Sequence, residues 1–117
     1  MALSRLAREF AAEIKNHDWS DAPYRADRAG HDRKVDNRST DTLDPAETGR
    51  VRMNVMWVTA QVLGHRDPNF DVYEFAEACG VETRTRRGAK DGGIRAGLRI
   101  DDEGRFAKPG TWEYATE

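Results

Sequence analysis

The sequence predicts a single α+β domain, with three to four helices around an apolar central helix at about 45–63 and a small C-terminal antiparallel β-hairpin or three-stranded sheet. Apolar residues recur at helical spacing through the first two thirds of the chain, and past Gly80 they alternate with polar residues, as in a half-buried strand. A chain of 117 residues has room for one core. We expect one domain over 1–117, with a helical part at about 3–80, a β part at about 81–108 and a short tail at 109–117.

The first helix is expected over residues 3–16, where apolar residues recur every three or four positions between charged ones. A second helix is expected at about 22–36, with Ser20 or Asp21 as its cap and Pro23 in its first turn. This second helix has few apolar side chains to bury, chiefly Tyr24 and Val35.

The central helix has the clearest start signal. Asp44 can accept from the first-turn N–H groups, Pro45 suits the first helical position and Glu47 favours the positive end of a helix. Residues 51–63 leave few polar positions, so we expect this helix at the centre of the domain. Gly64 is expected to end it.

A short helix is expected at 71–79, capped by Asp71 and stopped by Gly80. It occupies the position of a recognition helix in a winged-helix protein, but it carries Glu74 and Glu77 and no base. Phosphates would repel such a helix, which argues against a DNA-reading winged helix. The acidic helix and the basic segment that follows are instead expected to pair with each other.

Past Gly80 the pattern predicts strands at 81–86, 94–100 and 105–108, with a turn at 101–104. Between the first two strands lies a basic, glycine-rich loop. The stretch 84–99 holds six cations against one acid, namely Arg84, Arg86, Arg87, Lys90, Arg95 and Arg99 against Asp91. Such a patch suits phosphates, because Arg forks and glycine N–H groups approach anions closely. The alternative is a charged hairpin that simply stays solvated. The loop lacks a Walker ending.

The overall charge of -2 is too small to draw the whole protein to nucleic acid or to an anionic membrane. A lone cysteine, Cys79, excludes an intramolecular disulfide and favours a reducing compartment. No apolar run is long enough to span a bilayer, and the first residues resemble no signal peptide. We expect a cytoplasmic protein with no membrane contact.

Two His-Asp pairs, His17-Asp18 and His31-Asp32, suggest a metal site, since imidazole and carboxylate bind zinc, manganese and iron. The alternative is that His17 closes the first helix near its negative end. No nucleophile elbow or cysteine nucleophile context is present, so neither an enzyme nor a cofactor is expected. Most aromatic residues are expected inside, with Tyr73 and Trp112 as the exceptions.

Three segments, His17–Arg25, Asp27–Arg33 and Asp67–Phe75, resemble small proteins of actinobacterial phages, mycobacteriophages among them. The resemblance carries no activity, cofactor or catalytic residue. It implies a phage product that acts in the cytoplasm of a bacterial host, often by binding a host protein.

The leading hypothesis is therefore a non-enzymatic protein that binds a host protein. The expected contact residues are Arg84, Arg86, Arg87, Lys90, Arg95, Tyr73, Glu74 and Glu77. Two alternatives remain open: a nucleic-acid-binding module that uses the loop at 84–99, and a metal-binding protein that uses the His-Asp pairs. A homodimer is compatible with the apolar central helix.

Overall fold

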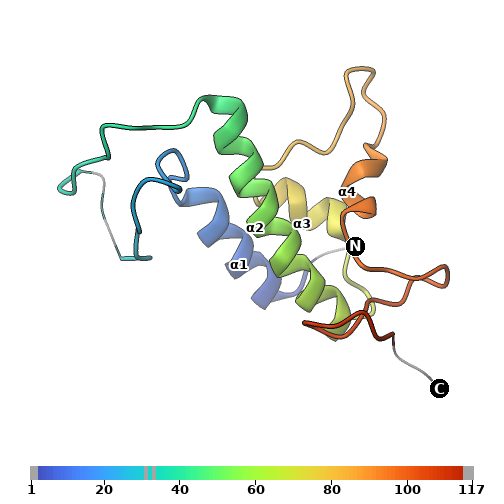
Figure 1. Ribbon diagram of the computed structural model, residues 1–117. Helices are drawn as coiled ribbons and strands as arrows, with labels where there is room; N and C mark the ends of the chain where they lie inside the picture. The colour runs from blue at the N-terminus through green and yellow to red at the C-terminus, as the bar shows by residue number, and fades with distance from the viewer. Residues whose placement is uncertain (1–2, 31, 33, 115–117) are drawn as a thin grey trace.

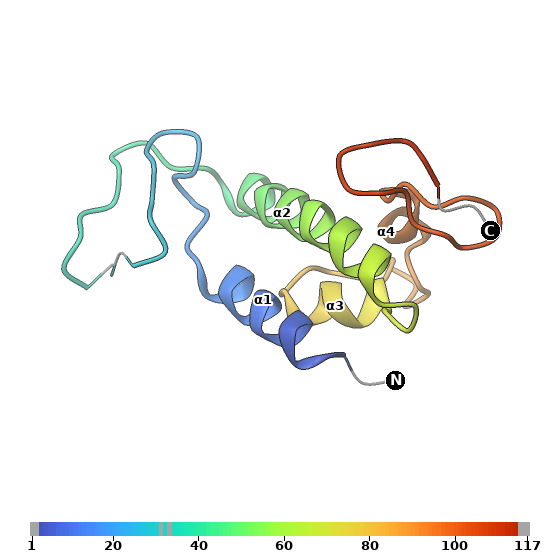
Figure 2. The ribbon, with the colours of Figure 1, turned by 90° about the horizontal axis from the view of Figure 1, so that it is seen from below.

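A computed structural model of the chain describes residues 3–30, 32 and 34–114 (Figure 1). Its helices are α1 Arg5–Asn16, α2 Pro45–Arg66, α3 Val72–Ala78 and α4 Gly92–Ala96. The first three pack against one another, and α4 contacts α3. Figure 2 shows the segments 17–30 and 34–44 on one side of this helical core and the segment 97–114 on the other.

Helix α1 forms where its apolar spacing predicts it. The Ser4 hydroxyl accepts from the Ala7 N–H at 3.1 Å and caps the first turn. Ala7, Ala11 and Ile14 are buried at intervals of three and four residues. The helix therefore packs through a narrow stripe in which two of the three buried residues are alanines, and it contacts α2 and α3.

Helix α2 begins as predicted and ends later. The Asp44 carboxylate accepts from the Glu47 N–H at 2.8 Å, and the Glu47 carboxylate accepts from the Asp44 N–H at 3.0 Å. Gly64, the expected end, lies inside the helix, so that prediction was wrong. A Cβ at Gly64 would lie 2.2 Å from Phe106 Cε2. Gly64 therefore serves the close approach of the Phe106 ring and not the end of the helix.

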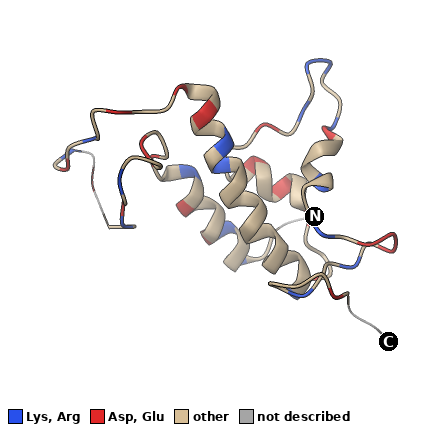
Figure 3. Ribbon diagram, in the orientation of Figure 1, with Lys and Arg blue, Asp and Glu red and all other residues tan. Residues whose placement is uncertain are grey.

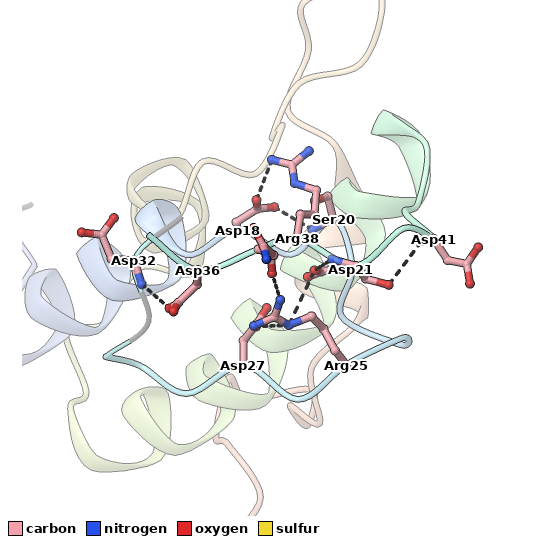
Figure 4. Close-up of polar contacts among 11 residues, drawn as sticks. Asp18, Ser20, Asp21, Arg25, Asp27, Asp32, Asp36, Arg38 and Asp41 are labelled. Atoms are coloured by element: carbon pink, nitrogen blue, oxygen red, sulfur yellow. Dashed lines mark hydrogen bonds and ion pairs between the residues drawn. The ribbon is translucent and has the colours of Figure 1, made fainter. Parts of the chain in front are cut away.

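The predicted helix at about 22–36 does not form in its described residues, which adopt turns and irregular structure. Tyr24 is 50% exposed and Val35 is 80% exposed, so neither supplies the burial that a helix of this length needs. Carboxylates organise the segment instead (Figure 4). The fully buried Asp21 accepts from the Ser39 N–H at 3.0 Å, and Asp18 pairs with Arg38 at 2.9 Å.

The expected β-hairpin or sheet is also wrong: the described residues contain no strand and only three isolated bridges. Two of these join Arg84 to Lys90 and Ile100 to Phe106. The segment after Thr83 folds back on itself, because the Asp91 N–H donates to the Thr83 carbonyl at 2.9 Å. The predicted strand at 81–86 thereby loses its expected partner at 94–100.

The second expected strand, at 94–100, overlaps helix α4, which covers its first three residues. Asp91 caps this helix by accepting from the Gly93 N–H at 2.9 Å. Ile94 and Leu98 are buried, and they lie four residues apart, a spacing that suits a helical turn as well as a strand. The turn predicted at 101–104 does form, because Asp101 accepts from the N–H groups of Glu103 and Arg105. These N–H groups, that of Arg105 first, hold the pKa of Asp101 below its ordinary value.

The core lies where α1, α2, α3 and α4 meet. Its largest fully buried apolar side chains are Phe75, Met56 and Ile94. Phe70 and Phe106 extend it toward the C-terminal segment, with ring centroids 6.3 Å apart. Among the helices described, none combines the length and the apolar character needed to cross a membrane.

Candidate functional site

The first candidate site is a groove between α2 and the C-terminal segment at 97–112. We call it the Trp112 groove; it has a volume of about 440 Å³ and is lined by Trp57, Val58, Gln61, Val62, Gly97, Arg99, Pro109, Gly110, Thr111 and Trp112. Its floor comes from α2 and its far wall from the C-terminal segment. Of the described residues that line it, Arg99 is the one charged residue.

The floor of the groove is fixed by Trp57. Its indole N–H donates to the Ile94 carbonyl at 2.8 Å, which ties α2 to α4. A Cβ at Gly97 would lie 2.3 Å from Trp57 Cε2, so the indole lies flush against the backbone at this glycine. The ring therefore has little freedom to reorient, and the floor is preformed.

The wall of the groove is fixed by Gln61, which is 5% exposed. The Gln61 side chain donates to the carbonyls of Arg99 and Ala107, each at 3.2 Å, and accepts from the Arg99 N–H at 2.9 Å. These bonds attach two stretches of the C-terminal segment to α2. A buried amide is stabilising only when its hydrogen bonds are made, and here both its donor and its acceptor atoms are used.

Arg99 connects the backbone held by Gln61 to Thr111 and Trp112 at the rim of the groove. Its Nε donates to the Thr111 carbonyl at 2.8 Å, and its guanidinium lies 5.6 Å from the centroid of the Trp112 ring. Trp112 is 76% exposed, and Val58, which lines the groove from α2, is 73% exposed. The expectation that Trp112 is an exposed aromatic residue is confirmed.

The second candidate site is the loop at residues 84–90, which we call the basic arch. Its turn is closed by the Gly88 N–H, which donates to the Thr85 carbonyl at 2.9 Å, and by the Thr85 N–H, which donates to the Ala89 carbonyl at 2.8 Å. Gly88 has φ +84°, a left-handed conformation that other residues rarely adopt. Every residue of the arch is exposed.

The structure brings together only part of the predicted basic patch. Arg84, Arg86, Arg87 and Lys90 share the basic arch, whereas Arg95 lies on α4 and Arg99 belongs to the Trp112 groove. The reason is the cap at Asp91, which ends the arch and starts α4. The cations expected to form one patch over 84–99 therefore lie in the arch, on α4 and in the Trp112 groove, and Lys90 and Arg95 line one pocket together with Tyr73.

Tyr73, Glu74 and Glu77 lie on α3, beneath the basic arch. The Tyr73 hydroxyl donates to the Asp91 carbonyl at 2.9 Å, and the Lys90 ammonium lies 4.4 Å from the centroid of its ring. Tyr73 is half-buried, and these two contacts anchor the arch to α3.

The expected charge pairing between the acidic helix and the basic segment takes a different form. Among the described residues, no ion pair joins Glu74 or Glu77 to a cation of the arch. Glu77 instead accepts from the Thr83 hydroxyl at 2.7 Å, just before the arch begins. A neutral hydroxyl thus joins the two elements, and within the described part of the chain the arginines of the arch have no acidic partner.

Of the two His-Asp pairs, the structure describes His17, Asp18 and Asp32, and His31 lies outside the described residues. The His17 ring packs on Trp19 with centroids 4.3 Å apart, and Asp18 accepts from Arg38 and from the Ser20 N–H. His17 is the C-cap of α1, as the alternative interpretation expected. No group of three potential metal ligands occurs within the described part of the chain.

Cys79 is fully buried between α3 and its neighbours. Burial raises the pKa of its thiol to about 12, an effect that the nearby Arg52 guanidinium reduces only in part. A thiol in this environment stays protonated and is a poor nucleophile.

Sequence reasoning missed the role of Gln61. The available signal was a polar residue four positions after Trp57 and three before Gly64, on one face of an otherwise apolar helix, because a buried amide requires hydrogen-bond partners. Comparisons of the chain with protein-family models, with curated proteins and with solved structures found no match.

Proposed function

We propose that this chain is a non-enzymatic binding protein and that a partner protein docks in the Trp112 groove. One observation carries the proposal: the Trp112 ring is 76% exposed although the segment around it is fixed to the fold. An exposed indole leaves a large apolar area in water. Arg99 and Gln61 hold this part of the chain in place. An exposed indole that is held in place in this way suits a partner protein that covers it.

The composition of the groove agrees with a protein-binding surface. Trp and Arg are the residue types most enriched at the energetic centres of interfaces, and here Trp112 and Arg99 lie in contact. Val58 and Val62 add apolar surface along α2, with exposed fractions of 73% and 39%. A preformed site binds with a smaller entropy cost than one that must be ordered first.

The chemistry of the groove also limits the partner. Its polar lining residues are Arg99, Gln61 and Thr111, and the Gln61 amide and the Thr111 hydroxyl are already used in hydrogen bonds within the chain. A complementary segment therefore presents an apolar side chain to Trp57 and Trp112 and a carboxylate to Arg99. The resemblance to phage proteins adds that this partner belongs to the bacterial host.

The test is capture from a nuclease-treated actinobacterial lysate by the tagged protein, followed by binding measurements with the purified partner. We expect one discrete host protein, retained by the wild type and lost with Trp112→Ala and with Val58→Asp. Tyr24→Ala is the matched control, because Tyr24 is also exposed but lies outside the groove. It should retain the partner at wild-type affinity.

Capture of the same proteins by the wild type and by Trp112→Ala would contradict the proposal. So would a dimer of the purified chain that Trp112→Ala dissociates, since a second copy would then be the occupant of the groove.

A further inference from the structure

The basic arch presents four cations to solvent. Arg84, Arg86, Arg87 and Lys90 fall within seven residues that include no acid. None of the four takes part in an ion pair with another described residue. Their internal contacts are an Arg84 hydrogen bond to the Gly88 carbonyl at 3.1 Å and the Lys90 contact with the Tyr73 ring. Four positive charges this close together repel one another, and binding of an external anion reduces that repulsion.

The arch is ordered although it is exposed. Besides the bonds that close its turn, an isolated bridge joins Arg84 to Lys90, and the Asp91 N–H reaches the Thr83 carbonyl. The Tyr73 hydroxyl holds the end of the arch through the Asp91 carbonyl. Binding an anion therefore requires little new order in the backbone, and the ordering cost falls on the arginine side chains.

We infer that the basic arch binds the phosphate backbone of nucleic acid. Duplex DNA presents one negative charge about every 1.7 Å along its axis, a charge density that suits a cluster of four cations. The planar fork of arginine, which supplies three of the four, matches phosphate oxygens bidentately. This site is separate from the Trp112 groove and does not rest on the function proposed for that groove.

The placement of charge favours an extended polyanion. Figure 3 shows the arch projecting away from the helices, with Lys and Arg colouring near its tip and Asp and Glu on α3 beneath it. Glu74 and Glu77 would repel phosphates that approached the helix. The tip therefore contacts the backbone from outside, without insertion of α3 into a groove of the duplex, and the binding is independent of sequence.

The test is fluorescence anisotropy of a labelled duplex of about 20 base pairs, titrated with the full chain between about 50 and 200 mM salt. Four phosphate contacts predict a slope of about −3.6 in a plot of log affinity against log salt. The variant Arg86→Gln/Arg87→Gln should lower this slope by about two units and weaken binding at least about tenfold at the lowest salt.

The matched control is Arg66→Gln/Lys108→Gln, which removes the same charge from exposed positions outside the arch. It should bind the duplex like the wild type. Equal losses in the two double variants would overturn the inference, because the attraction would then come from net charge alone. Absence of binding at about 50 mM salt would overturn it as well. Displacement of the duplex by polyglutamate at equal charge concentration would assign the arch to acidic proteins and overturn it too.

Discussion

The Gln61 side chain holds the Arg99 backbone on both sides: it accepts from the Arg99 N–H at 2.9 Å and donates to the Arg99 carbonyl at 3.2 Å. This arrangement places a strand-like pair of hydrogen bonds between a helix side chain and a loop. It replaces part of the sheet that the sequence pattern predicts. The wall of the Trp112 groove therefore depends on one buried amide.

Replacement Gln61→Leu should destabilise the fold by about 2–4 kcal/mol, because it leaves backbone groups of Arg99 and Ala107 without partners. Urea unfolding measures the loss. Thr59→Val on the same helix is the control, since Thr59 bonds only to the Val55 carbonyl one turn away, and it should change stability by less than about 0.5 kcal/mol. Equal stabilities for Gln61→Leu and the wild type would show that the hydrogen bonds of the Gln61 amide do not stabilise the attachment of the C-terminal segment to α2.

The contact between Gly64 and Phe106 predicts that Gly64→Ala changes the free energy of unfolding in opposite directions with and without the Phe106 ring. Gly64→Ala should destabilise by about 1–3 kcal/mol despite the higher helix propensity of alanine, because the new Cβ would lie 2.2 Å from Phe106 Cε2. In a Phe106→Ala background the same change should instead be neutral or stabilising by up to about 1 kcal/mol. Thermal or urea unfolding of the four proteins gives the coupling energy.

Gly49→Ala is the control for this cycle. Gly49 lies in the same helix, and a Cβ there would meet nothing within 4 Å. The substitution should stabilise by about 0.5–1 kcal/mol. A destabilising effect of Gly64→Ala that persists without the Phe106 ring would contradict the packing explanation.

These two contacts also mark what the sequence could predict. The starts of α2 and α3 follow from Asp44 and Asp71, because a cap acts on the N–H groups of its own first turn. The end of α2 does not follow, because the reason for Gly64 is a ring that lies far along the chain. Local signals thus set the beginnings of helices, whereas the role of Gly64 inside α2 depends on packing against a distant residue.

The lack of a sheet among the described residues has a similar cause. Ile94 and Leu98 fit a strand as well as a helical turn, and the signal that distinguishes the two is the cap at Asp91. Asp91 is the one acid of the basic stretch 84–99, and it caps the helix that begins at Gly92. This cap separates the cations of the arch from Arg95 on α4 and from Arg99 in the Trp112 groove.

Trp112 and Trp57 should differ sharply in their effect on stability. Trp112→Ala should change the free energy of unfolding by less than about 0.5 kcal/mol, because the ring is 76% exposed. Trp57→Phe should cost about 1–3 kcal/mol, since it leaves the Ile94 carbonyl without its donor. Urea unfolding followed by far-UV circular dichroism measures both. A large loss with Trp112→Ala would mean that this ring supports the fold and that its exposure is no sign of a binding site.

Cys79 predicts a loss of stability at alkaline pH. In the folded chain burial raises the thiol pKa from 9.0 to about 12, while the unfolded chain keeps the ordinary value. The unfolded state therefore releases this proton first as the pH rises. The stabilisation is fully present below pH 9 and is lost between pH 9 and 12, by up to about 1.4 kcal/mol per pH unit.

The measurement is the free energy of unfolding from pH 7 upward for the wild type and for Cys79→Ala, in which the other titrating groups are unchanged. We expect the wild type to lose stability more steeply above pH 9, so that the difference between the two proteins narrows as the thiol ionises. Parallel curves would contradict the raised pKa. An aromatic disulfide reagent at pH 8 gives an independent check, because it should react with Cys79 only at the rate at which the protein opens, and Arg52 alone should not activate the thiol.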